Sequence, residues 1–124
     1  MSAVATILVV DDSPLVLGLV REVLTEAGHR AVVADNPLTL PSLVRHTAFD
    51  LALVDLNMPT IQGDVVITIL ERAGLPSSKV LLFSEAAEDE LKEKVKTCKA
   101  LGYIKKGTDE HLLKEVAHFL TVAH

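Results

Sequence analysis

The chain has 124 residues, the usual length of one domain, and 49% of them are hydrophobic, enough for one substantial core. It has 12 Lys and Arg and 17 Asp and Glu, which give a formal net charge of −5. Nucleic-acid-binding proteins usually carry an excess of positive charge, so we expect no direct nucleic-acid contact. No apolar stretch reaches the roughly 20 residues of a membrane span, and no secretory signal precedes the first apolar run. The single cysteine excludes an intramolecular disulfide. We therefore expect one cytoplasmic domain, over residues 1–124, with no membrane association.

Four short segments are apolar throughout, which is typical of strands that are covered on both faces of a sheet. They occupy residues 7–10, 31–34, 51–54 and 80–83. We expect a fifth, shorter strand at residues 103–104.

The first two helices are expected between these strands. Ser13 and Pro14 suit the N-cap and first turn of a helix that ends near Gly28. Its inward stripe is expected to comprise Val16, Val20, Val23, Leu24 and Ala27. An Asn-Pro pair at residues 36–37 opens the second helix, and Pro41 should shorten or kink it.

Three further helices follow along the chain. One is expected at residues 63–73 and stops at Gly74. The next, at residues 86–100, has acidic residues early and lysines late, which complements its macrodipole. Thr108 can cap the last helix. The inward residues of this last helix are expected to be Leu113, Val116, Ala117 and Leu120.

The alternation of strand and helix, repeated five times, predicts the fold class. Right-handed crossovers need a helix between neighbouring parallel strands, so the pattern favours a parallel sheet with helices on both faces. This is a doubly wound α/β fold with five strands. Ligands of such sheets bind at the carboxyl ends of the strands, where the strand order reverses.

Polar residues follow four of the five strands. Asp11 and Asp12 follow the first, Asp55 the third, Ser84 the fourth and Lys105 the fifth. Three carboxylates packed together raise one another's pKa, so such a cluster usually needs a cation, and Mg²⁺ is the hard, oxygen-seeking ion that suits it. The remaining groups are those that phosphoryl transfer needs: a carboxylate nucleophile, and a hydroxyl and an ammonium to hold the phosphoryl oxygens.

At these residues the sequence resembles the response-regulator receiver family, over about residues 6–120. The matching runs are ILVVDD at residues 7–12, DLNMP at 55–59 with Gly63 beyond, LFS at 82–84 and GYIK at 102–105. Together, in this order and spacing, they form a specific signature. The resemblance implies a flavodoxin-like (βα)5 receiver fold with strand order 2-1-3-4-5. It also implies a phosphorylation-dependent signalling switch in a two-component phosphorelay.

The resemblance implies a role for each residue of the acidic cluster. Asp55 is the expected phosphoacceptor, and Asp11 and Asp12 are the acidic pair that holds Mg²⁺. The backbone carbonyl of Asn57 is expected to join the metal ligands. Such a domain phosphorylates and dephosphorylates itself, so we expect an acceptor and not a turnover enzyme.

Three other residues are implied in binding the phosphoryl group and in switching. Lys105 would pair with the phosphoryl oxygens, Ser84 would hydrogen-bond them, and the rotamer of Tyr103 would report the state. The implied phosphodonor is a sensor histidine kinase or a phosphotransfer protein. A downstream protein would bind the face made by the fourth helix, the fifth strand and the last helix.

Each of these residues has a simpler structural alternative. Asp11 and Asp12 could cap the first helix, and Asp55 could be a turn residue. Ser84 could cap the fourth helix, and Tyr103 could belong to the core.

The lysine and the position after Ser84 depart from the family pattern. Lys105 could be a solvated surface residue, and Lys106 beside it leaves the choice between the two lysines open. Lys106 also occupies the place where the family usually has proline after a cis peptide bond, and a cis bond before a non-proline residue costs roughly 2.5 to 4 kcal/mol. Glu85 replaces a residue that is usually small, which predicts slow phosphorylation.

Two other functions compete with the switch. Glu85 and Lys106 support a degenerate receiver that binds proteins without being phosphorylated. The other is a phosphatase or phosphotransferase of the haloacid-dehalogenase type, whose nucleophile lies in an Asp-x-Asp motif. Here the acids are adjacent, and 124 residues leave no room for the cap of such an enzyme.

Overall fold

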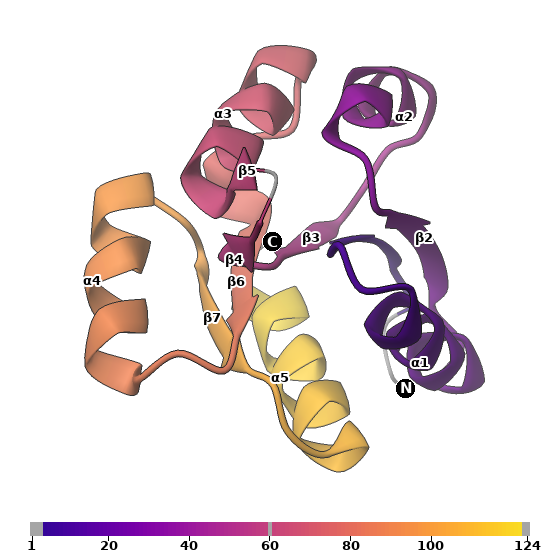
Figure 1. Ribbon diagram of the computed structural model, residues 1–124. Coiled ribbons are helices and arrows are strands. Elements are labelled where there is room, and N and C mark those ends of the chain that lie inside the picture. Colours follow the sequence, from indigo (N-terminus) through magenta and orange to yellow (C-terminus); the bar gives the residue numbers. More distant parts are fainter. Residues whose placement is uncertain (1–3, 60, 123–124) are drawn as a thin grey trace.

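The protein is described by a computed structural model for residues 4–59 and 61–122, and its centre is a five-stranded parallel sheet (Figure 1). The strands are β1 (Thr6–Val10), β2 (Arg30–Ala34), β3 (Leu51–Val54), β6 (Val80–Ser84) and β7 (Gly102–Lys105). They lie in the order β2-β1-β3-β6-β7, all in parallel. Counted among the strands of this sheet alone, this is the order 2-1-3-4-5, so the doubly wound α/β fold is confirmed.

Helices cover both faces of the sheet (Figure 1). They are α1 (Pro14–Glu26), α2 (Leu40–His46), α3 (Gly63–Ala73), α4 (Glu88–Cys98) and α5 (Asp109–Val122), with short 3-10 turns at Pro37–Thr39 and Ser77–Lys79. One core cluster joins the sheet to α2, α3 and α4, and a second joins it to α1 and α5. Within the described residues, no helix combines the length and the apolarity that crossing a bilayer requires.

The expected capping residues lie at the helix ends. The Ser13 hydroxyl accepts a hydrogen bond from the backbone N–H of Val16 at 3.3 Å, and the Thr108 hydroxyl accepts one from His111 at 3.1 Å. Gly74 ends α3 with φ of 118°, a left-handed conformation that favours glycine. These contacts fix the helices on the strand ends from which the polar side chains project.

The rotation of two helices differs from the expectation. The buried residues are Leu17, Val20 and Leu24 in α1, and Leu112, Val116 and Leu120 in α5. Ala27 and Ala117, which were expected to face inward, are exposed. In both helices apolar residues occupy adjacent positions, so two neighbouring apolar stripes are compatible with the helical repeat. Packing against the sheet buries the stripe that contains the larger side chains.

A two-stranded antiparallel hairpin, which the sequence did not predict, follows the third strand of the sheet. It consists of β4 (Asn57–Met58) and β5 (Ile61–Gln62). The hairpin separates Asp55 from the start of α3, so it shapes one side of the acidic cluster.

Candidate functional site

Three carboxylates meet at the carboxyl edge of the sheet. Because β1 and β3 are neighbours with Val10 opposite Val54, Asp11 and Asp55 leave the sheet side by side. One carboxylate oxygen from each of Asp11, Asp12 and Asp55 lies within 4.8 Å of the others. Asp11 and Asp55 are only 1% and 5% exposed, whereas Asp12 is more exposed than either. The predicted convergence of these residues is therefore observed.

Hydrogen bonds orient the two buried carboxylates. The Oδ1 atom of Asp11 accepts from the backbone N–H of Ser13 at 3.0 Å. The Oδ1 atom of Asp55 accepts from the backbone N–H of Asn57 at 3.2 Å. The Asn57 carbonyl as a metal ligand stays a prediction, but this hydrogen bond does place Asn57 beside the acidic cluster.

The surroundings raise the pKa of Asp55 above its ordinary value. Burial is the main cause, and the negative charges of Asp11 and Asp12 add to it. The Asn57 N–H and the nearby Lys106 ammonium act in the opposite direction but do not cancel the effect. The ionised form of Asp55 is therefore destabilised in this site, and a cation bound beside it would stabilise that form.

The lysine at the cluster is Lys106, and the prediction of Lys105 is wrong. The Nζ atom of Lys106 donates to Oδ2 of Asp11 at 2.9 Å and lies 3.7 Å from Oδ2 of Asp55. Lys105 is exposed and lines a hollow that α4, β7 and α5 form along the edge of the sheet.

Strand alternation explains why the later lysine is the one that reaches the cluster. Successive side chains of a strand point to opposite faces, so Lys106 shares its face with the buried Ile104, and Lys105 shares its face with Tyr103. The backbone N–H of Lys106 donates to the Ser84 carbonyl at 2.9 Å, and this bond continues the pairing with β6. The ammonium lies 5.4 Å from the ring centroid of buried Phe83. Ile104 was the signal in the sequence that could have identified the correct lysine.

With Lys106 as the lysine at the cluster, the position after it, where the family usually has proline, is residue 107 and not residue 106. The residue after the lysine at the cluster is Gly107, and none of the peptide bonds in the described part of the chain is cis. Glu85 is exposed and lines a hollow of about 240 Å³ between α1 and the segment that leads to α5, to which Lys106 also contributes. The expectation that Glu85 slows phosphorylation stays a prediction.

Ser84 lies at the same edge, at the end of β6, and only 1% of it is exposed. Its hydroxyl accepts a hydrogen bond from the backbone N–H of Ala86 at 3.1 Å. The N-cap residue of α4 is Ala87, which makes no side-chain capping bond, so Ser84 does not cap this helix.

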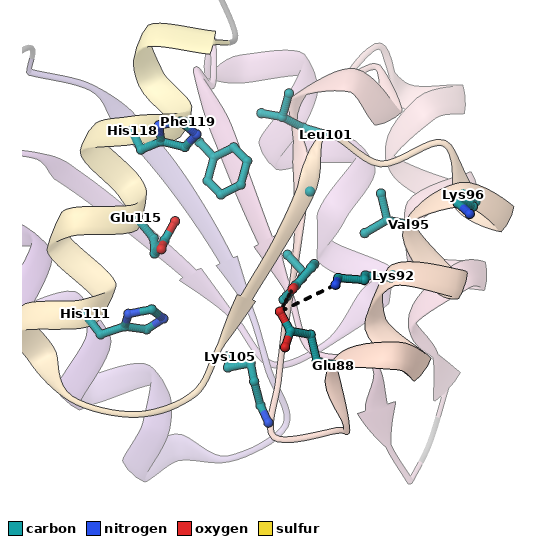
Figure 2. Close-up of a pocket in the computed structure, with 12 residues that line it drawn as sticks. Glu88, Lys92, Val95, Lys96, Leu101, Lys105, His111, Glu115, His118 and Phe119 are labelled. Atoms are coloured by element: carbon teal, nitrogen blue, oxygen red, sulfur yellow. Dashed lines mark hydrogen bonds and ion pairs between the residues drawn. The ribbon is translucent and has the colours of Figure 1, made fainter.

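Tyr103 lies on the α4 side of β7 and is half-buried. Its hydroxyl donates to Oε1 of Glu88, the first residue of α4, at 2.6 Å. Both residues line the hollow in Figure 2 between α4, β7 and α5, which has a volume of about 660 Å³. The contact with Glu88 was not predicted, because strand and helix patterns do not show which side chains meet across a loop.

The donor atoms of the acidic cluster fit a magnesium ion. Carboxylate and carbonyl oxygens are the ligands that Mg²⁺ takes in proteins, with water completing the octahedron. Both carboxylate oxygens of Asp11 already accept hydrogen bonds, from Ser13 and Lys106. Asp12 and Asp55 each keep a carboxylate oxygen that accepts no hydrogen bond from the described residues, and the division of the ligands among the three carboxylates stays a prediction.

Gly63 lets the segment after Asp55 pack against the start of α3. A Cβ atom at this position would lie 3.0 Å from the Leu56 Cα and 3.1 Å from the Asp55 carbonyl oxygen. These are backbone atoms, so they yield less readily than the tip of a flexible side chain. The glycine at this point is thus required by close approach.

We expect Gly63→Ala to lower the free energy of unfolding by about 1 to 3 kcal/mol, the usual cost of overpacking. Gly18→Ala is the matched control, because the Cβ at Gly18 meets nothing within 4 Å and this residue lies inside α1. There alanine should stabilise by roughly 0.5 to 1 kcal/mol. Urea denaturation of the two variants measures both effects, and equal stability of Gly63→Ala and wild type would contradict the packing argument.

Comparisons with known proteins agree on one family. The model of the response regulator receiver domain matches residues 7–118. The virulence sensor protein BvgS of Bordetella pertussis is 33% identical over 100 residues, which cover 77% of this chain and 8% of that protein. The nitrate/nitrite response regulator protein NarL of Escherichia coli K12 is 31% identical over 114 residues, 90% of this chain and 49% of NarL. The chain thus covers less than a tenth of the length of BvgS and about half of the length of NarL.

A solved structure gives the same result for the fold. The chemotaxis protein CheY4 of Vibrio cholerae superposes with a TM-score of 0.84 at 25% identity, and the match covers 94% of this chain and 99% of that one. A receiver domain protein from Methanospirillum hungatei has a TM-score of 0.80 at 22% identity, covering 98% and 97% of the two chains.

Proposed function

Because the chain belongs to the response regulator receiver domain family of two-component systems, we propose that it is a cytoplasmic, phosphorylation-dependent switch whose phosphoacceptor is Asp55. One observation carries this proposal: the oxygens of Asp11, Asp12 and Asp55 lie within 4.8 Å of one another, with the Lys106 ammonium 2.9 Å from Asp11. In this proposal the cluster supplies a nucleophile, ligands for Mg²⁺ and a cation for the phosphoryl oxygens.

In the proposed reaction an oxygen of Asp55 forms a bond to phosphorus while the bond from phosphorus to the donor breaks. With a sensor histidine kinase or a phosphotransfer protein as donor, the P–N bond breaks and the imidazole leaves with a proton. Bound Mg²⁺ supplies positive charge for the transferring oxygens. Lys106 turns from Asp11 towards the phosphoryl group, and the Ser84 hydroxyl donates to it.

The metal is proposed to bind through Asp12 and Asp55, so Asp12→Ala should weaken Mg²⁺ affinity severely. Asp12 is the more solvent-exposed carboxylate of the three, so its removal disturbs the fold least. Asp89→Ala is the matched control, because Asp89 is an exposed carboxylate in the first turn of α4, away from the cluster. Calorimetric titration with Mg²⁺ measures both variants. Equal affinities of wild type and Asp12→Ala would remove Asp12 from the metal site.

The proposal as a whole is tested with a small-molecule donor. Incubation of the wild-type protein with acetyl phosphate and Mg²⁺ should add one phosphoryl group, detected by intact mass spectrometry, that is released by both acid and base. Addition of EDTA should prevent the modification. A chain that takes no phosphoryl group and binds no beryllofluoride would contradict the proposal. We propose an acceptor that undergoes one modification cycle at a time and not an enzyme that turns over a separate substrate.

The alternative of a degenerate receiver loses one of its two supports. It rested on Lys106 as a replacement of the usual proline, and Lys106 is the residue that contacts the acidic cluster. The other support, Glu85, is exposed and lies on the α1 side of that lysine. The observed contacts therefore favour the phosphorylated switch.

The downstream partner is proposed to bind the face of α4, β7 and α5. The hollow on this face has an apolar floor that includes Val95, Leu101 and Phe119 (Figure 2). Lysines from both α4 and β7 lie at its rim, and Lys105 is one of them. Lys105, which does not reach the acidic cluster, thus belongs to the proposed docking face.

A further inference from the structure

One side-chain contact joins the first turn of α4 to β7. The Tyr103 hydroxyl donates to Oε1 of Glu88 at 2.6 Å, and the Lys92 ammonium lies 3.9 Å from the same oxygen (Figure 2). A hydrogen bond to an ionised carboxylate is shorter and stronger than one between neutral groups. The Tyr103 ring, which lines the hollow, is thereby joined to the first residue of α4, which precedes it by 15 residues.

The same segment is tied to the acidic cluster through Ser84. The Ser84 hydroxyl accepts from the N–H of Ala86 at 3.1 Å, and three residues separate Ser84 from Glu88. The chain between the two is therefore short, and Ser84 cannot move far without displacing the first turn of α4. Two hydrogen bonds, one at each end of this segment, hold it in the observed conformation.

We propose that Glu88 is a positioning residue, which holds Tyr103 at the start of α4 and so stabilises the conformation in which the Ser84 hydroxyl bonds to its own loop. The inference rests on the proposed function, because it is the phosphoryl group on Asp55 that would draw Ser84 away. The Glu88–Tyr103 bond then opposes the switch, and its loss shifts the population towards the phosphorylated conformation.

The charges around Tyr103 support a specific pairing with Glu88. The hydrogen bond from Tyr103 is the main reason that the pKa of Glu88 is lowered, and Lys92 and Lys105 add to it. The same bond is the main cause of the raised pKa of Tyr103, with Glu115 on α5 contributing. Two histidines of α5, His111 and His118, line the hollow as well.

The composition provides a direct probe of this contact, because Tyr103 is the sole tyrosine and the chain has no tryptophan. Tyrosine labelled with ¹³C at Cζ gives one NMR resonance that follows ionisation of the phenol. Glu88→Gln should lower the Tyr103 pKa, since the charged acceptor is removed. Asp89→Asn is the control, because it removes an acid from the same helical turn but leaves Glu88 in place. An unchanged pKa in Glu88→Gln would overturn the pairing.

Binding of beryllofluoride with Mg²⁺ tests the positioning role. Glu88→Ala should increase the affinity about two- to fivefold, the factor that corresponds to an exposed charge interaction. Tyr103→Phe should give a similar gain, and the double variant should gain no more than either single one, since both remove the same contact. Asp89→Ala should bind like wild type.

Failure of this inference is distinguishable from failure of the proposed function. If wild type binds beryllofluoride and Glu88→Ala binds it equally well or more weakly, the positioning role is overturned and the switch stands. If wild type binds none, the proposed function and the inference fall together. Additive gains in the double variant would also overturn the inference, because they would show that the two residues act separately.

Discussion

The Asp55→Asn variant should take up no phosphoryl group from acetyl phosphate under conditions in which the wild-type protein takes up one. Asparagine keeps the size of the side chain and an oxygen to accept the N–H of Asn57, but its amide is not a nucleophile. Intact mass spectrometry followed by peptide mapping measures the result. Phosphorylation that persists in Asp55→Asn, or maps to Asp11 or Asp12, would remove Asp55 as the acceptor.

Loss of labelling in this variant should not come from unfolding. Because the pKa of Asp55 is raised in the folded state, the folded chain holds this proton more tightly than the unfolded chain does. The stability of the wild type therefore falls as pH rises from the unfolded pKa through the folded one, and the cost persists at pH 7. Asp55→Asn removes it, so without Mg²⁺ the variant should be at least as stable as wild type at neutral pH, and the difference should vanish in acid. Urea denaturation at the two pH values checks this.

Lys106→Ala should reduce the rate of phosphorylation by acetyl phosphate by about a hundredfold, the usual loss when one preorganised donor to a reacting oxygen is removed. Its Mg²⁺ affinity should not fall, because removal of the lysine frees the Asp11 Oδ2 atom that now accepts its hydrogen bond. A fall in rate without a fall in metal affinity separates the lysine from the metal ligands. Calorimetry and the time course of labelling give the two quantities.

Lys105→Ala is the control for this variant and should be phosphorylated at nearly the wild-type rate. Lys105 is exposed on the opposite face of β7, next to the α4–α5 hollow. If Lys105→Ala lost activity and Lys106→Ala kept it, the placement of the two lysines would be reversed. This pair of variants differs by one position in the chain, so it tests strand alternation directly.

The carboxylates could be predicted from the sequence because each follows a strand whose apolar run leaves no doubt about where it ends. Asp11 and Asp55 come directly after four consecutive apolar residues, and parallel strands align their carboxyl ends at one edge. For Asp11 and Asp55 no choice between the two faces of a strand had to be made, because β1 and β3 end directly before them. The fold class followed from the same regular alternation of strand and helix.

The lysine could not be predicted with the same rule, because its strand is short and two lysines follow it. The prediction took the first polar residue after Ile104, and in a strand that continues to residue 105 this residue points to the wrong face. The contact between Tyr103 and Glu88 depends on the course of the loop before α4, which no periodic pattern encodes. Ala27 and Ala117 show the same limit for helices, whose rotation is decided by packing against the sheet.

The last strand of the sheet, like β1, β3 and β6, contributes side chains to both core clusters. Tyr103 packs with the cluster of α2, α3 and α4, whereas Ile104 belongs to the cluster of α1 and α5, which also contains Phe83 beneath Lys106. Tyr103 and Lys106 are three residues apart, an odd number that puts them on opposite faces. Substitutions would therefore preserve the faces of the two positions, whereas the gain or loss of one residue between them would not. A single insertion or deletion between the two would put both side chains on the same face, so that either the ammonium would face the docking hollow or the phenol would face the acidic cluster.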